Sequence, residues 1–246
     1  MDAQTLVLVF LAFAFGGILK GATGAGAPIL AVPLLVILYD VPFAVAVFQL
    51  PNLVPNMVQA WRFRADRLDS RFLVALCLAG GLGAGVGTVA LAGLSSRFLM
   101  LGVAIAVFLY VGFRFLNPGW RLDRKLAGRV VSPVAFLAGV LQGGSGISAP
   151  ISVAFLNTMK LERPQFISTI SVFFVAMAVI QIPAQAAFGI LTAERLFYSM
   201  LALVPLMTFM PVGAFIGRRM TPKLFDMIIL SLLTILAVKL VYDALN

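Results

Sequence analysis

The sequence predicts an all-α polytopic membrane protein with two inverted repeats, each a re-entrant helical hairpin (or broken helix) plus three transmembrane helices. Three observations support this fold class. The chain is 62% hydrophobic and only 11% charged, whereas soluble domains carry about 25% charged residues. Two matching glycine- and proline-containing breaks interrupt its apolar runs. Its cations gather in short loops between those runs, where the positive-inside rule would place them.

The two breaks share the pattern G-x3-G-x2-G-x2-A-P, at residues 17–28 and 139–150. Glycine and proline weaken a helix, and broken backbone survives in lipid only where it is buried in protein or lines a polar cavity. Matched breaks in two halves are typical of a transporter binding site. The alternative is close helix packing through small residues. We favour the cavity because both breaks also carry polar side chains.

The first repeat is expected at about residues 4–117. Residues 5–39 are almost continuously apolar. As one helix they would be about 52 Å long, against a hydrocarbon core of about 30 Å, so the segment must break at its glycines. The other apolar runs of this half predict three full spans, at 41–61, 72–94 and 98–115.

The second repeat is expected at about residues 130–245, after a cytoplasmic connector at 117–129, so that residues 1–246 form a single transmembrane domain. An ungapped shift of 122 positions aligns the glycines and prolines of the two breaks. The arms beside the second break are expected to be short, at about half a bilayer each. They cover 133–141 and 151–159, and the later spans are 167–190, 196–217 and 224–245.

The distribution of cations between the two sides selects a topology. If the broken segments cross the membrane, the two sides carry 11 and 6 cations. If each broken segment is a re-entrant hairpin, the split becomes 14 against 3, with Lys20 left inside the membrane. The positive-inside rule favours the second arrangement. It inverts the repeats and predicts that both termini are periplasmic, in a multi-pass protein of the cell inner membrane.

Inverted hairpins would bring two tips together near the midplane, which favours an anion site. Half-helices that point inward present free N–H groups and positive dipole ends. An ionisable side chain inside the membrane is a functional hypothesis by default, and its alternative is snorkelling to the interface. The predicted substrate-binding residues at the tips are Lys20, Gly21, Thr23, Gly24, Gly26, Gln142, Gly143, Gly144, Ser145, Gly146 and Ser148.

A polar stripe follows the first break. Gln49, Asn52, Asn56 and Gln59 recur at spacings of 3, 4 and 3, which places all four on one helix face. Such a stripe lines a polar path or bonds helices together, and the sequence leaves both interpretations open. Asn52, Asn56 and Gln59 are included among the predicted substrate-binding residues.

The composition argues against several kinds of chemistry. The chain has no histidine and one cysteine, and no carboxylate lies at the centre of a predicted span. Zinc sites, haem sites and buried proton relays therefore lack their usual groups. We expect no enzyme, no cofactor and no metal site. The expected partners are a small anionic substrate and the lipid bilayer, with no nucleic acid, and a homodimer is left open.

The sequence resembles the TauE/SafE family of sulfite and organosulfonate exporter-like permeases. The resemblance rests on the motif at 21–28, its repeat at 143–150, and the echoed Pro42 and Pro164, and it covers essentially the whole chain. It implies a secondary transporter, and an exporter, of small sulfur-containing organic anions such as organosulfonates or sulfite. The substrate would be bound at the midplane between the two hairpin tips. An anion channel, or an uptake permease for another small oxyanion, is the alternative.

Overall fold

A computed structural model describes residues 3–116 and 121–219, together with nine residues of the C-terminal segment: 227, 230, 231, 234, 235, 237, 238, 241 and 242. This part of the chain is helical and holds no strand. Five of its helical segments are long and apolar enough to cross a membrane. The prediction of an all-α membrane protein is therefore confirmed. The helices are α1 (Ala3–Thr23), α2 (Ala27–Leu38), α3 (Val41–Val47), α4 (Gln49–Arg62), the 3-10 helix η1 (Arg64–Asp66), α5 (Ser70–Gly93), α6 (Ser96–Leu116), α7 (Arg124–Ser145), α8 (Ala149–Thr158), α9 (Arg163–Ala187) and α10 (Ala193–Arg219).

Both predicted breaks are present, between α1 and α2 and between α7 and α8. Gly24 and Gly146 turn the chain with φ values of 87° and 75°, a region that only glycine occupies without strain. Pro28 and Pro150 stand at the starts of α2 and α8, where the missing N–H breaks no helix bond. We call residues 20–26 the first tip and residues 142–148 the second tip.

The arms of the hairpins are unequal in length, which corrects one expectation. α1 and α7 have 21 and 22 residues, whereas α2 and α8 have 12 and 10. The prediction of a nine-residue first arm at 133–141 is wrong, because α7 already begins at Arg124 and includes 124–129 of the predicted connector. Its polar first turns extend the helix beyond the apolar run. α2 folds back along α1, since a Cβ on Gly16 would lie 3.2 Å from the Ala27 carbonyl oxygen.

The predicted span at 41–61 is divided at Phe48 into α3 and α4. Pro51 explains the division, because it cannot donate to the Val47 carbonyl and its ring opposes that group. Asp40 begins α3 by accepting a hydrogen bond from the Phe43 amide at 2.6 Å. The predicted spans at 72–94, 98–115, 167–190 and 196–217 correspond to α5, α6, α9 and α10. The last predicted span, 224–245, lies mostly outside the described residues.

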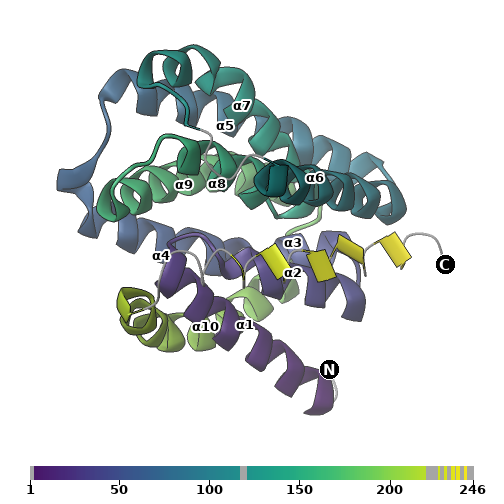
Figure 1. Ribbon diagram of the computed structural model, residues 1–246. Helices are drawn as coiled ribbons and strands as arrows, with labels where there is room; N and C mark the ends of the chain where they lie inside the picture. The colour runs from purple at the N-terminus through teal and green to yellow at the C-terminus, as the bar shows by residue number, and fades with distance from the viewer. Residues whose placement is uncertain are drawn as a thin grey trace.

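Two helix pairs pack with their backbones in contact, α5 with α7 and α1 with α10 (Figure 1). A Cβ on Gly139 would lie 2.8 Å from the Ala84 amide nitrogen, and one on Gly143 would lie 2.7 Å from that of Thr88. Residue numbers rise together along the two helices, so α5 and α7 run parallel. α1 and α10 are parallel by the same test, with Gly17 against Leu206 and Gly217 against Ala22.

Each of these helix pairs joins one helix from each half of the sequence, and α3, α4 and α9 lie between the pairs (Figure 1). Two large buried apolar clusters flank this middle layer. One is built mainly from α1, α2, α3 and α10, and the other mainly from α5, α7, α8 and α9. The polar side chains of α4 and α9 are therefore enclosed between two apolar shells.

Each tip contacts a helix from the other half of the sequence. A Cβ on Gly24 would lie 2.9 Å from Cγ1 of Ile167 on α9, and a Cβ on Gly146 would lie 3.4 Å from Cγ2 of Val45 on α3. Gly24 and Gly146 are 122 positions apart, and so are Val45 and Ile167. The repeat seen in the sequence therefore has a counterpart in the packing.

The same contacts give the relative directions of the middle helices. α9 meets the first tip at Ile167 and the second tip at Gln181, whose Nε2 donates to the Gln142 carbonyl at 3.2 Å. α3 and α4 meet the second tip at Val45 and the first tip at Asn56, which bonds Lys20 at 2.8 Å. The two segments therefore run antiparallel. No hydrogen bond between described residues joins the tips directly. The inversion of the repeats across a bilayer stays a prediction.

Candidate functional site

Lys20 is the centre of the candidate site. Its side chain is 2% exposed, so it does not snorkel to an interface. Its ammonium donates to Asn56 Oδ1 at 2.8 Å and to the Gly24 carbonyl at 3.2 Å, and lies 5.9 Å from the centre of the Phe174 ring. An ammonium has three donors, and these hydrogen bonds use two. Within the described part of the chain, no carboxylate contacts it.

The polar stripe of α4 lies buried beside Lys20, as its spacing predicts. Gln49, Asn52, Asn56 and Gln59 are all at most 4% exposed. Asn56 also donates to the Asn52 carbonyl at 2.6 Å and to Asn52 Oδ1 at 3.0 Å. Gln59 Oε1 accepts from Ser171 of α9 at 3.2 Å. Asn56 and Gln59 therefore bond α4 to α1 and α9. This is one of the two interpretations that the sequence leaves open.

Other polar atoms in the middle layer have no hydrogen-bond partner among the described residues. Buried polar groups in proteins are almost always paired, so an unpaired one calls for a water, an ion or a ligand. These atoms lie on α4 and α9, the two helices that separate the tips. This is the pattern of the other interpretation, a polar path. The atoms are Gln49 Oε1, Asn52 Nδ2, Ser168 Oγ, Thr169 Oγ1, Gln181 Oε1 and both amide atoms of Gln185.

The amides at the tips differ from the predicted free donors. The Gly24 amide donates to the Lys20 carbonyl and the Gly146 amide to the Gln142 carbonyl, both at 2.7 Å. These bonds close the ends of α1 and α7, so neither amide is free for an anion. The hydroxyls of Thr23 and Ser145 are also engaged, because they accept from the amides of Ala25 at 2.9 Å and Ile147 at 3.4 Å.

The starts of the short arms keep the character expected of an anion site. Gly26 and Ser148 occupy the N-cap positions of α2 and α8, and neither makes a side-chain cap hydrogen bond. The Ser148 side chain is fully buried. A helix start without a cap leaves amide donors unpaired and carries a positive partial charge. Of the predicted tip residues, these two lie where an anion would meet a helix start.

Two of the remaining predicted glycines, Gly21 and Gly143, serve helix packing. A Cβ on Gly21 would lie 2.7 Å from the Ala214 amide nitrogen, and a Cβ on Gly143 would press equally on α5. Gly144 is less crowded, with its nearest neighbours at 3.6 Å. The small-residue explanation of the motifs therefore applies to Gly21 and Gly143, whereas the turn explanation applies to Gly24 and Gly146. Gln142 is 2% exposed and lies at the second tip.

Arg163 contacts the first tip, and the sequence does not predict this contact. It opens α9, and its Nη2 donates to the carbonyls of Ala22 at 3.2 Å and Gly21 at 3.4 Å. A cation at a helix C-terminus satisfies free carbonyls and opposes the negative end of the dipole. In the sequence Arg163 is one loop cation among several. Its partners are 141 and 142 positions away, so no local pattern points to them.

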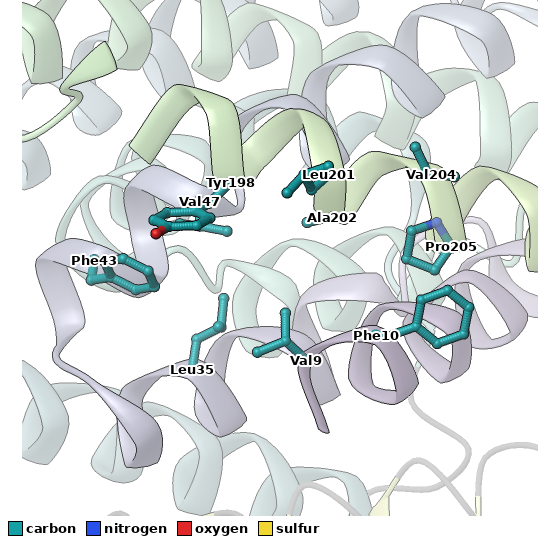
Figure 2. A pocket seen from close by; sticks show the side chains of 10 residues that line it. All are labelled: Val9, Phe10, Leu35, Phe43, Val47, Tyr198, Leu201, Ala202, Val204 and Pro205. Atoms are coloured by element: carbon teal, nitrogen blue, oxygen red, sulfur yellow. The ribbon is translucent and has the colours of Figure 1, made fainter. Parts of the chain in front are cut away.

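A cavity of about 280 Å³ lies elsewhere, between α1, α2, α3 and α10. Figure 2 shows its lining, which is apolar or aromatic, with Phe43 and Tyr198 at one end and Phe10 and Pro205 at the other. Neither Lys20 nor any residue of the polar stripe lines it. The Tyr198 hydroxyl is the one side-chain donor among the described residues of this lining, and no cation lies among them to compensate the charge of an anion. We therefore place the candidate site at Lys20 and not in this cavity.

The comparisons with known proteins agree with the resemblance seen in the sequence. The model of the family described as Sulfite exporter TauE/SafE matches residues 9–240. The match includes both tips, the polar stripe and Arg163. Neither the curated proteins nor the solved structures provide a match to the chain. Because the family match covers nearly the whole chain, this membrane protein belongs to the Sulfite exporter TauE/SafE family.

Proposed function

We propose that this protein is a secondary transporter that exports a small sulfur-containing anion, such as an organosulfonate or sulfite, and binds it beside Lys20. The observation that carries the proposal is the buried ammonium of Lys20, which has one free donor and no carboxylate partner in the described part of the chain. A buried charge costs several kcal/mol unless an opposite charge compensates it. A bound sulfonate or sulfite would supply that charge.

The surroundings of Lys20 suit such an anion. The Gly24 carbonyl that Lys20 binds belongs to the turn leading into α2, so the uncapped start of α2 lies at the same site. The helix start would donate hydrogen bonds to the oxygens of the anion. Asn52 Nδ2, one helical turn from Asn56, is a further buried donor without a partner among the described residues. The other predicted ligands enter the proposal as lining of the path between the tips.

The inverted, re-entrant arrangement belongs to the same proposal. Antiparallel α4 and α9, with α5 and α7 parallel, bring four cationic regions to one end of the bundle. They are the turns at 62–69, 121–124 and 159–163 and the end of α10. The positive-inside rule would place this end in the cytoplasm. Both termini would then be periplasmic, in a bacterial inner membrane.

Burial of the site favours a transporter over an open channel. Lys20, Asn56 and Gln59 are at most 4% exposed. A site enclosed from both sides must open to each side in turn, which is how transporters with repeats work. Counterflow in liposomes tests this point. A transporter preloaded with unlabelled substrate accumulates labelled substrate transiently, whereas a channel lets the label equilibrate without such an overshoot.

The test of the site is anion binding to the purified protein, measured by titration calorimetry with sulfoacetate, taurine, sulfite and sulfate. The variant is Lys20→Gln, whose amide can still donate to Asn56. A hydrogen bond to a charged group contributes about 1.5–3 kcal/mol, so the affinity should fall by roughly 10- to 100-fold. The control is Lys125→Gln, which removes an exposed lysine of α7 and should leave binding unchanged. Equal binding by wild type and Lys20→Gln would refute the proposed site.

A further inference from the structure

Three buried glutamines of α4 and α9 have side-chain oxygens without a donor among the described residues: Gln49, Gln181 and Gln185. Gln49 and Gln181 each use the amide nitrogen, on the Val45 carbonyl at 3.1 Å and on the Gln142 carbonyl at 3.2 Å. Their Oε1 atoms are left unpaired, and Gln185, one turn further along α9, has neither amide atom paired. The three side chains are at most 2% exposed. The hydrogen bonds of the nitrogens determine which way the amides of Gln49 and Gln181 face, so their oxygens are true acceptors.

The contacts of their anchoring groups place Gln49 and Gln181 around the same tip. The Gln142 carbonyl accepts from both Gln181 Nε2 and the Gly146 amide. Gly146 in turn faces Val45, whose carbonyl accepts from Gln49. Gln181 therefore bonds the second tip directly, and Gln49 bonds Val45, which contacts the tip at Gly146.

The repeat relation gives an independent reason to pair these glutamines. At the first tip, the Ser171 hydroxyl donates to Gln59 Oε1 at 3.2 Å. A shift of 122 positions converts this pair into Gln49 and Gln181. A hydroxyl facing an amide oxygen can satisfy it, whereas two amide oxygens cannot satisfy each other. The second tip thus has two acceptors where the first tip has a donor and an acceptor.

In the part of the chain that the structure describes, no Lys or Arg side chain bonds the helix end at the second tip as Lys20 and Arg163 bond the first. α1 ends beside the Lys20 ammonium and the Arg163 guanidinium, which bind the carbonyls of Gly24 and Ala22. The positions that correspond to Lys20 and Arg163 are Gln142 and Val41, both uncharged. The end of a helix carries a negative partial charge that a cation stabilises. At the end of α7 neither corresponding side chain can supply this charge.

We propose that the second tip binds one exchangeable Na⁺ ion, with the side-chain oxygens of Gln49, Gln181 and Gln185 as ligands. Hard cations take oxygen ligands. Neutral amide oxygens without a carboxylate compensate one positive charge better than they compensate two, which favours a monovalent ion. In transporters, carbonyls at the ends of broken helices coordinate Na⁺. At the second tip the Na⁺ ion would supply the positive charge that the Lys20 ammonium supplies at the first tip. The site itself does not depend on anion binding, whereas its use as the coupling ion rests on the proposed function.

The test measures thermal unfolding of the purified protein in NaCl, KCl and choline chloride at constant ionic strength. A ligand that binds only the folded state raises its stability with concentration. At a Na⁺ concentration of about a hundred times Kd, we expect Tm to rise by roughly 5–10 °C. Gln181→Leu and Gln185→Leu should abolish this rise. Gln185→Glu, which adds a charge at the same place, should bind Na⁺ at least as tightly as the wild type.

Lys20→Gln separates this proposal from the anion site, because it should lose anion binding and keep the Na⁺-dependent rise in Tm. The same shift in Na⁺, K⁺ and choline would overturn the proposal, since water would then account for the unpaired oxygens. A Na⁺ response that survives both Gln181→Leu and Gln185→Leu would overturn the location. If Lys20→Gln leaves anion binding intact while Gln181→Leu removes the Na⁺ response, the proposed function of Lys20 fails and the cation site stands.

Discussion

The packing of α7 against α5 yields a quantitative prediction for Gly143→Ala. A Cβ at this position would lie 2.7 Å from the Thr88 amide nitrogen and 2.8 Å from the Gly87 Cα. Ordinary contact begins at 3.4 Å, so the two backbones must separate by at least 0.7 Å. All of these neighbours are backbone atoms, which cannot turn aside as a flexible side chain can. The strain must therefore move a helix.

Gly128→Ala, on the same helix, is the matched control, because nothing lies within 4 Å of its Cβ position. Alanine favours a helix interior over glycine by about 0.5–1 kcal/mol, and this gain applies to both variants. Overpacking costs about 1–3 kcal/mol and applies to Gly143→Ala only. The difference between the two variants therefore isolates the packing cost. At about 2–4 °C per kcal/mol for a chain of this size, Gly143→Ala should melt roughly 2–12 °C below Gly128→Ala.

The assay is thermal unfolding of both purified variants in one detergent, followed by circular dichroism. Equal Tm values for Gly143→Ala and Gly128→Ala would refute the close backbone contact of α5 and α7. Gly143 would then be free for the role at the hairpin tip that the sequence favours. Anion binding by a folded Gly143→Ala protein, unchanged relative to the wild type, would separate a packing role from a ligand role.

Two further predictions concern the tips and the topology. Gly24→Ala should destabilise the protein by about 1–2 kcal/mol, because alanine is strained at the positive φ of this position. The loss should exceed that of Gly146→Ala, since the Cβ at position 24 would meet Ile167 at 2.9 Å, whereas the closest contact at Gly146 is 3.4 Å. Equal Tm values for the two variants would contradict this prediction. The topology can be tested with single cysteines at positions 67, 162 and 194 in a cysteine-free background, labelled in intact cells with an impermeant maleimide. The re-entrant topology predicts labelling at 194 only. Labelling at 162 but not at 67 would instead support eight simple crossings.

The glycine-proline motifs predict the position of each break closely, because both residues act through local backbone geometry. Gly24 and Gly146 occupy the left-handed region, and Pro28 and Pro150 open the next helices. The face of the α4 stripe is also predictable, since its periodicity depends only on the pitch of a helix. Features that depend on a few neighbours along the chain are thus within reach of sequence reasoning.

Features that depend on distant partners are not. The start of α7 at Arg124 extends past the apolar run, so hydropathy places it too late. The bonds from Arg163 to the end of α1 join residues more than 140 positions apart. The motif glycines have two uses, and the sequence alone does not separate them. Gly21 and Gly143 admit a neighbouring helix, whereas the turn glycines have positive φ, and only the packing distinguishes these roles.

The arrangement of the helix pairs indicates which parts of the protein can move as units. The sequence halves suggest that one repeat rocks against the other, yet each close helix pair joins the two halves. Separating the halves would pull α1 from α10 and α7 from α5, the helices whose glycines bring backbone against backbone. We infer that each of these two pairs, α1 with α10 and α5 with α7, moves as one body, because packed interfaces of this kind shift as units rather than deform. α1 then carries the first tip and Lys20, while α7 carries the second tip. A relative movement of the two bodies would change the separation of the tips across the buried polar layer of α4 and α9, which is the step that opening a site between them requires.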